Sequence, residues 1–247
     1  MREIRQHSLP GVLAVWAAAA LPMAALAWLV APAVVSPSTT DPAWFRAVLL
    51  AMTAGLVWQG VLVALLVYAE QRTLRWSVVR QALWLTAPRT PDGRPAPRAW
   101  WLILPLGLGF AAEEAIPALP HPAAHDFAEF VGSTTGRAFW EGNWSWLGLL
   151  LVMVVFNTVL GEELLFRGWL LPRMGGAFGR LDWVANGVLF ATYHLHMPWV
   201  IPSVLLDTLW LSWPSRRFRS AWFGIAVHSL QSVLILVVVL LLVLGKG

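Results

Sequence analysis

Long runs of apolar residues, separated by short polar segments, are the main pattern along this chain. A helix needs about 20 apolar residues to cross the hydrocarbon core of a bilayer. Five runs approach or exceed this length and are expected to span a membrane: residues 11–35, 43–68, 99–117, 144–171 and 221–244. The first run contains Pro22 and Pro32, where a kink is expected because proline cannot donate a backbone hydrogen bond.

Two shorter apolar segments, residues 183–196 and 199–213, are separated by His-Met-Pro. Each is short for a complete crossing, so one or both are expected to be tilted or sheltered by neighbouring helices. Counting both, the pattern predicts an all-α, polytopic transmembrane helical bundle of about seven spans, with six to eight as the range.

The polar segments divide the chain into two parts. Residues 72–98 are rich in arginine, include a possible amphipathic interfacial helix over 74–85, and end in a loop rich in proline. We therefore assign residues 1–98 to an N-terminal transmembrane pair with an Arg-rich interfacial segment, and residues 99–247 to a second membrane unit.

The basic residues orient the predicted bundle. If the helices alternate in direction, one side carries Arg2, Arg5, Arg72, Arg75, Arg80, Arg89, Arg94, Arg98, Arg173, Arg180, Arg216, Arg217 and Arg219, and the other carries Arg46, Arg137 and Lys246. Cytoplasmic loops of membrane proteins carry the excess of Lys and Arg. The bias predicts a cytoplasmic N-terminus and an odd number of spans.

Composition agrees with a membrane protein. Hydrophobic residues make up 58% of the 247 residues and charged residues 12%, against about 25% charged in soluble domains. The absence of cysteine excludes disulfides and thiolate metal sites. The net charge of +4 lies in short loops beside apolar segments, so we expect membrane lipid and no nucleic acid as a partner. The apolar run over 12–35 is longer than the apolar region of a signal peptide, about 7–15 residues, and is interpreted as a retained helix.

Three charged residues lie within the 144–171 span: Glu162, Glu163 and Arg167. Each would cost about 2.5–3.5 kcal/mol at a helix centre facing lipid, so they are expected to face the protein interior. Glu163 and Arg167 are four residues apart and can pair, while Glu162 points elsewhere. A buried ion pair that only locks helices together is the structural alternative.

Two histidines, His194 and His228, lie at a similar depth to Glu162. At 1.5 Å per residue, all three are roughly 10–16 Å from the cytoplasmic ends of their helices. A carboxylate and an imidazole at one depth can polarise a water molecule. Ser232 lies four residues after His228 and could join it in donating to an oxyanion, and Phe190 can pack on His194.

These residues form three motifs in order. Glu162 to Arg167 reads EExxxR, Phe190 to His194 reads FxxxH, and His228 opens a third motif in the last helix. They resemble the CPBP family, which contains the CAAX prenyl endopeptidases and bacteriocin-processing or immunity-associated proteins. The resemblance covers roughly residues 146–238.

The resemblance implies an intramembrane endopeptidase of the glutamic type with a four-helix catalytic core in the C-terminal half. Glu162 and His194 would activate the attacking water, and Glu163 and Arg167 would support that site. His228 and the residue four positions later would form the oxyanion hole. The family usually has Asn or Asp at that later position, whereas this chain has Ser232.

Two other functions stay open at this stage. The buried polar cluster could belong to a catalytically silent membrane partner or immunity protein, which Ser232 favours. A proton-coupled carrier would use similar groups, but obvious repeats and broken-helix pairs are missing.

A metal is the alternative to an activated water alone. No cofactor is expected, although Glu162, His194 and His228 are residue types that could bind a catalytic zinc ion.

Several other polar residues receive a structural interpretation. The acid pair Glu113-Glu114 is expected at the membrane interface, His196 at a helix end and outside the site of His194, and Asp207 in a helix contact or cavity wall. Asn157 could line the cavity.

The substrate is expected to be a membrane-associated peptide or protein, either prenylated or carrying a C-terminal sorting signal. The Arg-rich, Lys-poor composition is typical of a bacterial protein, so the inner (plasma) membrane is the expected location.

Overall fold

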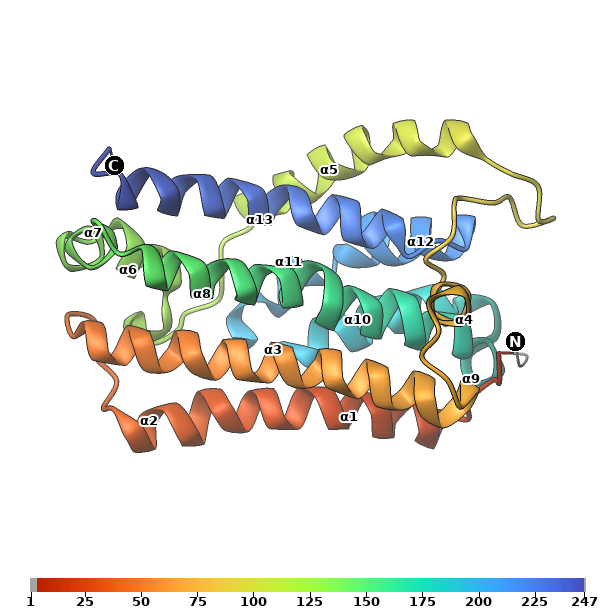
Figure 1. Cartoon of the computed structure of the whole chain (residues 1–247), viewed down its shortest axis with the longest axis horizontal. Helices are drawn as coiled ribbons and strands as arrows, with labels where there is room; N and C mark the ends of the chain where they lie inside the picture. The colour runs from red at the N-terminus through yellow and green to blue at the C-terminus, as the bar shows by residue number, and fades with distance from the viewer. Residues whose placement is uncertain (1–3, 247) are drawn as a thin grey trace.

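Four long helices follow the longest apolar runs in the computed structural model of the chain, which describes residues 4–246 (Figure 1). They cover Leu9–Val34, Pro42–Gln71, Trp144–Arg173 and Trp222–Val243, and each is long and apolar enough to cross a membrane. No β-strand occurs between residues 4 and 246, which confirms the all-α membrane bundle. The total of seven spans stays a prediction. Arg2 and the side chain of Glu114 lie outside the described residues.

The first long helix combines α1 (Leu9–Ala25), the π-helical η1 (Leu26–Val30) and α2 (Ala31–Val34). The chain continues as a helix through Pro22. Proline removes one backbone donor, which leaves the carbonyl one turn earlier without its usual partner. That carbonyl, on Ala18, accepts a hydrogen bond from the indole of Trp58 in α3 at 2.8 Å. The proline therefore ties the first two helices together.

The second long helix, α3 (Pro42–Gln71), has well-defined ends. The side chain of Asp41 caps it by accepting from the backbone N–H of Ala43 at 2.8 Å, and Pro42 occupies the first turn, where no donor is needed. After α3 the chain forms α4 (Trp76–Ala82), somewhat shorter than the amphipathic helix expected over 74–85.

The third predicted span is a helix of mixed type. It consists of η2 (Pro97–Leu102), α5 (Ile103–Ala112) and η3 (Glu113–Ala115). The connection that follows holds three short helices, η4 (Ala123–His125), α6 (Phe127–Gly132) and α7 (Thr134–Trp140).

The long helix that carries the EExxxR motif changes its winding around the paired glutamates. It runs through α8 (Trp144–Val155), η5 (Phe156–Gly161), η6 (Leu164–Leu170) and η7 (Leu171–Arg173), and η5 and η6 are π-helical. Arg173 closes its end: the guanidinium pairs with Glu70 and donates to the carbonyls of Ala82 and Trp169. This contact joins the ends of three elements.

The two shorter apolar segments form a hairpin that enters and leaves the bundle at the same end (Figure 1). Its first arm follows α9 (Gly175–Phe178) and η8 (Gly179–Leu181) and is α10 (Asp182–Tyr193). The return arm is η9 (Pro198–Val200), α11 (Ile201–Val204), η10 (Thr208–Ser212) and α12 (Trp213–Phe218), before α13 (Trp222–Val243). Neither arm crosses the bundle (Figure 1). The two short segments are sheltered by the neighbouring helices, as expected, and together they form a re-entrant hairpin.

Close packing holds the arms of this hairpin together. A Cβ atom at Gly187 would come within 1.9 Å of the hydroxyl of Thr208, so only glycine fits there. Asn186 donates to the carbonyl of Phe166 at 2.8 Å and accepts from Ser212 at 3.0 Å. The hairpin is therefore fixed to the π-helical stretch η6 by buried polar contacts as well as apolar ones.

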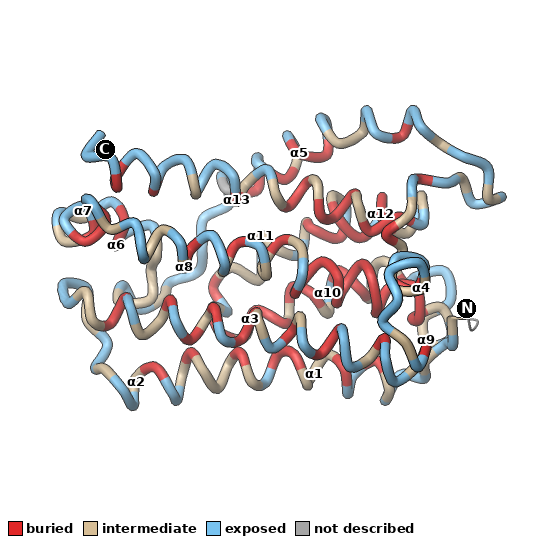
Figure 2. The backbone as a smooth tube through the Cα atoms, in the orientation of Figure 1, coloured by how far each residue is buried: buried red, intermediate tan, exposed pale blue. Residues whose placement is uncertain are grey.

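The two ends of the bundle differ in charge and burial. The N-terminus, α4, α9 and α12 lie at one end, here called the Arg-rich end, and α2, α6, α7 and the C-terminus lie at the other (Figure 1). Buried residues are concentrated toward the Arg-rich end, where the hairpin fills the bundle (Figure 2). The two termini lie at opposite ends of the bundle (Figure 1).

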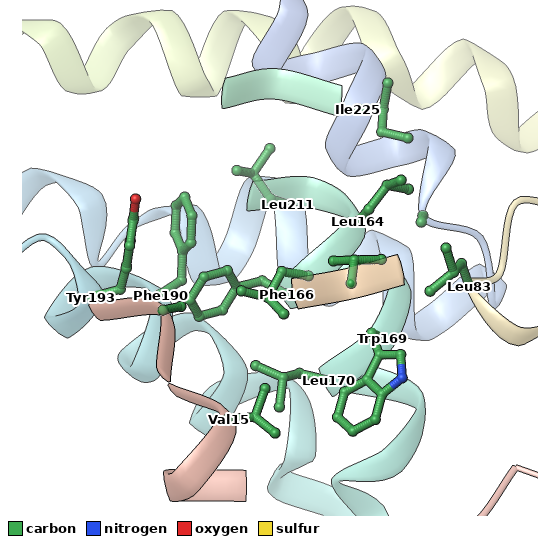
Figure 3. Packing of buried hydrophobic residues seen from close by; sticks show 14 of the residues in the cluster. Val15, Leu83, Leu164, Phe166, Trp169, Leu170, Phe190, Tyr193, Leu211 and Ile225 are labelled. Atoms are coloured by element: carbon green, nitrogen blue, oxygen red, sulfur yellow. The ribbon is translucent and has the colours of Figure 1, made fainter. Parts of the chain in front are cut away.

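Two apolar cores result from this arrangement. The larger one surrounds the hairpin and includes Phe166, Phe190 and Tyr193 (Figure 3). The second lies at the opposite end around Phe45 and Trp140. The space between the two cores is the setting of the site described next.

Candidate active site

A cavity of about 570 Å³ lies beyond the tip of the hairpin and is lined by residues of both apolar cores. Glu162, His194 and His228 all line it, so three side chains from separate elements meet at one cavity as their common depth suggested. Its other polar lining residues are Glu113, His125, Asn157, His196, Ser203, Asp207, Gln231 and Ser232. The remaining wall is mainly apolar.

Glu162 is held by donors on two sides. The amide nitrogen of Asn157 lies 3.0 and 3.2 Å from the two carboxylate oxygens, in the amide orientation that satisfies both of its polar atoms. Tyr193 hydrogen-bonds Glu162 through its hydroxyl, which itself accepts from Gln59 at 2.6 Å. Because the tyrosine oxygen accepts from Gln59, its proton is directed at the carboxylate.

The π-helical stretch η5 explains the contact between Asn157 and Glu162. Residues five apart are about 140° apart around a regular α-helix. A π-helix bonds residue i to residue i+5, so such residues lie close to one another on one face. The local winding therefore directs Asn157 at Glu162, a role that the sequence pattern did not fix.

Glu163 lies outside the cavity and forms a buried charge cluster behind it. Its Oε1 accepts from Nη1 of Arg167 at 3.0 Å and lies 3.1 Å from Nδ1 of His228. Glu163 and Arg167 are both fully buried. Gly224 provides the room for this carboxylate, because a Cβ atom there would come within 2.0 Å of Glu163 Oε2. The cluster links the 144–173 helix to α13.

Both imidazoles use Nδ1 for a contact within the protein and leave Nε2 for the cavity. Nδ1 of His194 lies 2.9 Å from the carbonyl oxygen of Phe190, and Nδ1 of His228 faces the carboxylate of Glu163. A carbonyl oxygen only accepts, so Nδ1 of His194 carries a proton and Nε2 is left to act on a ligand.

The ring of Phe190 lies next to His194, His228 and Arg167. Its ring packs edge to face on His194, with centroids 5.1 Å apart, and lies 6.3 Å from the ring of His228. The guanidinium carbon of Arg167 is 3.9 Å from the centre of the same ring. Phe190 thus separates the buried cation from the cavity while it fixes the orientation of His194.

His196 corrects the sequence interpretation. We expected it to point away from His194, on the assumption of a regular helix through both residues. The helix α10 ends at Tyr193, and His194 is its C-terminal cap. The rings of His194 and His196 stack with centroids 5.4 Å apart, and both line the cavity. A turn in place of a helix brings them together.

The expected interfacial acid Glu113 is also part of the cavity wall. Its side chain is 6% exposed, and it hydrogen-bonds the carboxyl group of Asp207 from the return arm of the hairpin. Two adjacent carboxyl groups at hydrogen-bond distance share a proton. The cavity therefore has a second acidic group opposite the motif residues, and Asp207 lies in the cavity wall as one of the two sequence interpretations proposed.

The third motif contributes two more residues to the cavity besides His228. Ser232, one turn after His228, is 3% exposed and lines it. Gln231, expected to point about 100° away, lines the cavity as well.

The candidate metal ligands named from the sequence were compared with their positions in the structure. Across residues 4–246, no three His, Asp or Glu side chains are placed so that they could hold a metal ion. Glu162, His194 and His228 line one cavity without forming such a group.

Three residues that hold the site were not identified as functional from the sequence: Gln59, Tyr193 and, in its specific role, Asn157. Tyr193 directly precedes His194, and Gln59 is an uncharged polar residue in the middle of an apolar span. A polar residue in the middle of an apolar run could therefore have identified Gln59 as part of a buried site. The orientation of Tyr193 depended on where the helix ends.

Part of the chain matches the model of a known protein family. Residues 143–234 match the model described as type II CAAX prenyl endopeptidase Rce1-like. The matched stretch starts just before α8, ends within α13 and contains all three motifs. No curated protein and no solved structure matches the chain.

Proposed function

We propose that this chain, whose residues 143–234 match the model of the Rce1-like type II CAAX prenyl endopeptidases, hydrolyses a peptide bond in a membrane-associated protein or peptide. The family is one of proteases, and the apolar helices make the chain an integral membrane protein. We propose the activity of this particular chain, its mechanism and its substrate.

The position of Glu162 is the observation that supports this proposal. The carboxylate of Glu162 is held by Asn157 and Tyr193 at the wall of a cavity that His194 and His228 also line. A buried carboxylate that served only to join helices would be expected to pair with a cation. The buried cation in this region, Arg167, pairs with Glu163 instead. Glu162 is thereby left facing the cavity with anchored geometry, as a general base requires.

The reaction follows from these positions. A water molecule between Glu162 and Nε2 of His194 gives a proton to the Glu162 carboxylate as its oxygen attacks the carbonyl carbon of the substrate. The carbonyl oxygen then carries the negative charge of a tetrahedral intermediate. When the C–N bond breaks, the proton held by Glu162 passes to the leaving amine. The products are a carboxylic acid and an amine.

The negative charge of the intermediate is stabilised by His228 and Ser232. Nδ1 of His228 lies 3.1 Å from Oε1 of Glu163, and this contact supports a protonated imidazole whose Nε2–H can donate to the oxyanion. The hydroxyl of Ser232 lines the cavity one turn away and is the second donor. Arg167 holds the carboxylate of Glu163 in place through their ion pair at 3.0 Å.

The substrate is proposed from the character of the cavity. Its mainly apolar wall suits an apolar or lipid-modified peptide segment, either prenylated or bearing a C-terminal sorting signal. The Arg-rich end is proposed to face the cytoplasm of a bacterium, with the protein in the inner membrane.

Substitution of the proposed base tests the function without a known substrate. Cells expressing wild-type protein are expected to contain new protein termini that are absent with Glu162→Gln, because the amide cannot accept the proton of water. Quantitative mass spectrometry of protein termini measures this. The glutamine variant should keep its melting temperature within a few degrees, since the side chain has the same shape. Identical termini in both strains would contradict the proposal.

Ser232→Ala tests the second donor. We expect cleavage to slow by about 10²–10³-fold, the loss seen when one oxyanion donor is removed from a soluble protease. Ser229→Ala is the matched control on the same helix, since its hydroxyl faces Thr158 at 3.3 Å. The control should retain nearly full activity in the same cleavage assay. Equal losses in the two variants would assign the effect to helix packing.

A catalytically silent immunity or partner protein is the second candidate. Ser232 favours it, because a hydroxyl reaches less far than the Asn or Asp usual in the resembling family. In that case Glu162→Gln would preserve the cellular function and no termini would depend on the protein.

A further inference from the structure

A second hollow, of about 200 Å³, lies at the Arg-rich end at the base of the hairpin. It is lined by Pro91, Trp183, Trp213, Arg216, Arg217 and Arg219 and shares no residue with the active-site cavity. Three guanidinium groups and two indoles thus surround one small space.

Two of these guanidinium groups form no close ion pair within the part of the chain that the structure describes. Arg216 pairs with Asp182 at 2.6 Å. Arg217 and Arg219 are exposed and form no ion pair within residues 4–246. Asp92 interacts with Arg217 at longer range, but its carboxylate pairs with Arg94 at 2.5 Å. The hollow is therefore strongly positive.

Hydrogen bonds to backbone carbonyls fix the walls of the hollow. The loop that contributes Pro91 is attached to the base of the hairpin, because Arg89 donates through its backbone N–H to the carbonyl of Phe218 at 2.9 Å. Ser220 donates to the carbonyl of Thr86 at 2.7 Å on the same side. The space is thus preformed, and a ligand would not need to order the loop.

Guanidinium groups bind phosphate through paired hydrogen bonds, and tryptophan side chains concentrate at the level of lipid headgroups. An exposed apolar stripe also leads away from the hollow along the return arm. Leu205, Leu209 and Trp213, each four residues apart, are 40%, 45% and 39% exposed. A free phosphate ion would make no favourable contact with this apolar stripe, whereas a lipid acyl chain would lie along it.

We propose that this hollow binds the phosphate headgroup of an anionic phospholipid, with an acyl chain along the Leu205–Leu209–Trp213 stripe. The lipid joins the two arms of the hairpin at their base, because Trp183 belongs to one arm and Trp213 to the other. The tip of the same hairpin carries His194, so the bound lipid stabilises the element that completes the active site. The evidence for lipid binding at this hollow does not depend on the proposed peptidase activity.

Lipid binding by the purified full-length chain tests the proposal. Wild-type protein in detergent is expected to retain phosphatidylglycerol, but not phosphatidylcholine, in native mass spectrometry, and to melt at higher temperature when phosphatidylglycerol is added. The double variant Arg217→Gln/Arg219→Gln should bind phosphatidylglycerol about 10- to 30-fold more weakly, given about 1 kcal/mol for each basic residue near an anionic surface. The matched control is Arg75→Gln/Arg80→Gln, which removes the same charge from exposed positions of the same end.

A second variant separates binding from folding. Arg219 has a left-handed backbone conformation, with φ of 50°, which glycine adopts without strain. Arg219→Gly is therefore expected to melt no lower than wild type without lipid and yet to lose most of the rise caused by phosphatidylglycerol. Equal lipid binding by the Arg217/Arg219 and Arg75/Arg80 variants would overturn the proposal. A rise of the same size with inorganic phosphate alone would overturn the assignment to a lipid.

Discussion

Replacing His194 by alanine is expected to slow peptide-bond cleavage by about 10²–10⁴-fold, while the same replacement at His196 should cost less than about tenfold. Both rings line the cavity and stack on each other at 5.4 Å, so either substitution removes a similar apolar contact. The difference lies in orientation. The carbonyl of Phe190 fixes Nδ1 of His194, whereas Nδ1 of His196 has no hydrogen-bond partner in the part of the chain that the structure describes.

The comparison is measured as single-turnover cleavage of a substrate found from the protein termini, in detergent or in proteoliposomes. Melting temperatures of the two variants serve as the control for folding. If His196→Ala is slowed more than His194→Ala, the assignment of the water-activating imidazole is wrong, although the cavity could still be the active site. Equal and small losses of cleavage rate in both variants would indicate that the chain is a catalytically silent immunity or partner protein.

Replacing Arg167 by alanine is expected to destabilise the folded protein by about 3–5 kcal/mol. The guanidinium is fully buried and donates to Glu163 at 3.0 Å, so its removal leaves a buried carboxylate with His228 as its remaining partner. Arg167→Lys should cost less, because it keeps the charge but cannot reproduce the planar stack on Phe190. Unfolding in mixed detergent micelles measures these differences.

A double variant shows whether the cost comes from the unpaired charge. Glu163→Leu/Arg167→Met removes both charges and is expected to recover most of the lost stability, since a buried ion pair can be exchanged for apolar side chains at little cost. Cleavage should stay low in the double variant because His228 has lost its carboxylate. If the double variant is no more stable than Arg167→Ala, packing and not charge governs this cluster.

Substitution of Gly224 is a second test of the role of the Glu163 carboxylate. A methyl group there would come within 2.0 Å of Glu163 Oε2, so Gly224→Ala is expected to displace the carboxylate and lower both stability and activity. Gly148→Ala on α8 is the control, since a Cβ atom at Gly148 meets nothing within 4 Å.

The apolar pattern predicted most of the membrane architecture. A run of about 20 apolar residues has few alternatives to a spanning helix, because every backbone polar group must be bonded internally in lipid. The predicted 43–68, 144–171 and 221–244 runs accordingly became Pro42–Gln71, Trp144–Arg173 and Trp222–Val243. The cost of a charge in lipid also predicted that Glu162, Glu163 and Arg167 face inward, which their burial confirms.

The short segments were less predictable because their length does not say where they turn. A hairpin that enters and leaves at one end has nearly the same composition as two short spans. Its depth depends on the close packing of Gly187 against Thr208 and on the contacts of Asn186 with η6. These contacts exist only once the chain has folded.

Hydropathy and the order of the motifs were enough to predict the class of protein, the inward-facing charges and the resemblance of residues 143–234 to the type II CAAX prenyl endopeptidase family. Only the tertiary structure decided the surroundings of the motifs. The π-helical winding of η5 directs Asn157 at Glu162, and the end of α10 at Tyr193 brings His196 beside His194. Residue spacing predicts a shared face only when the winding is known, and tertiary packing sets the winding at both places.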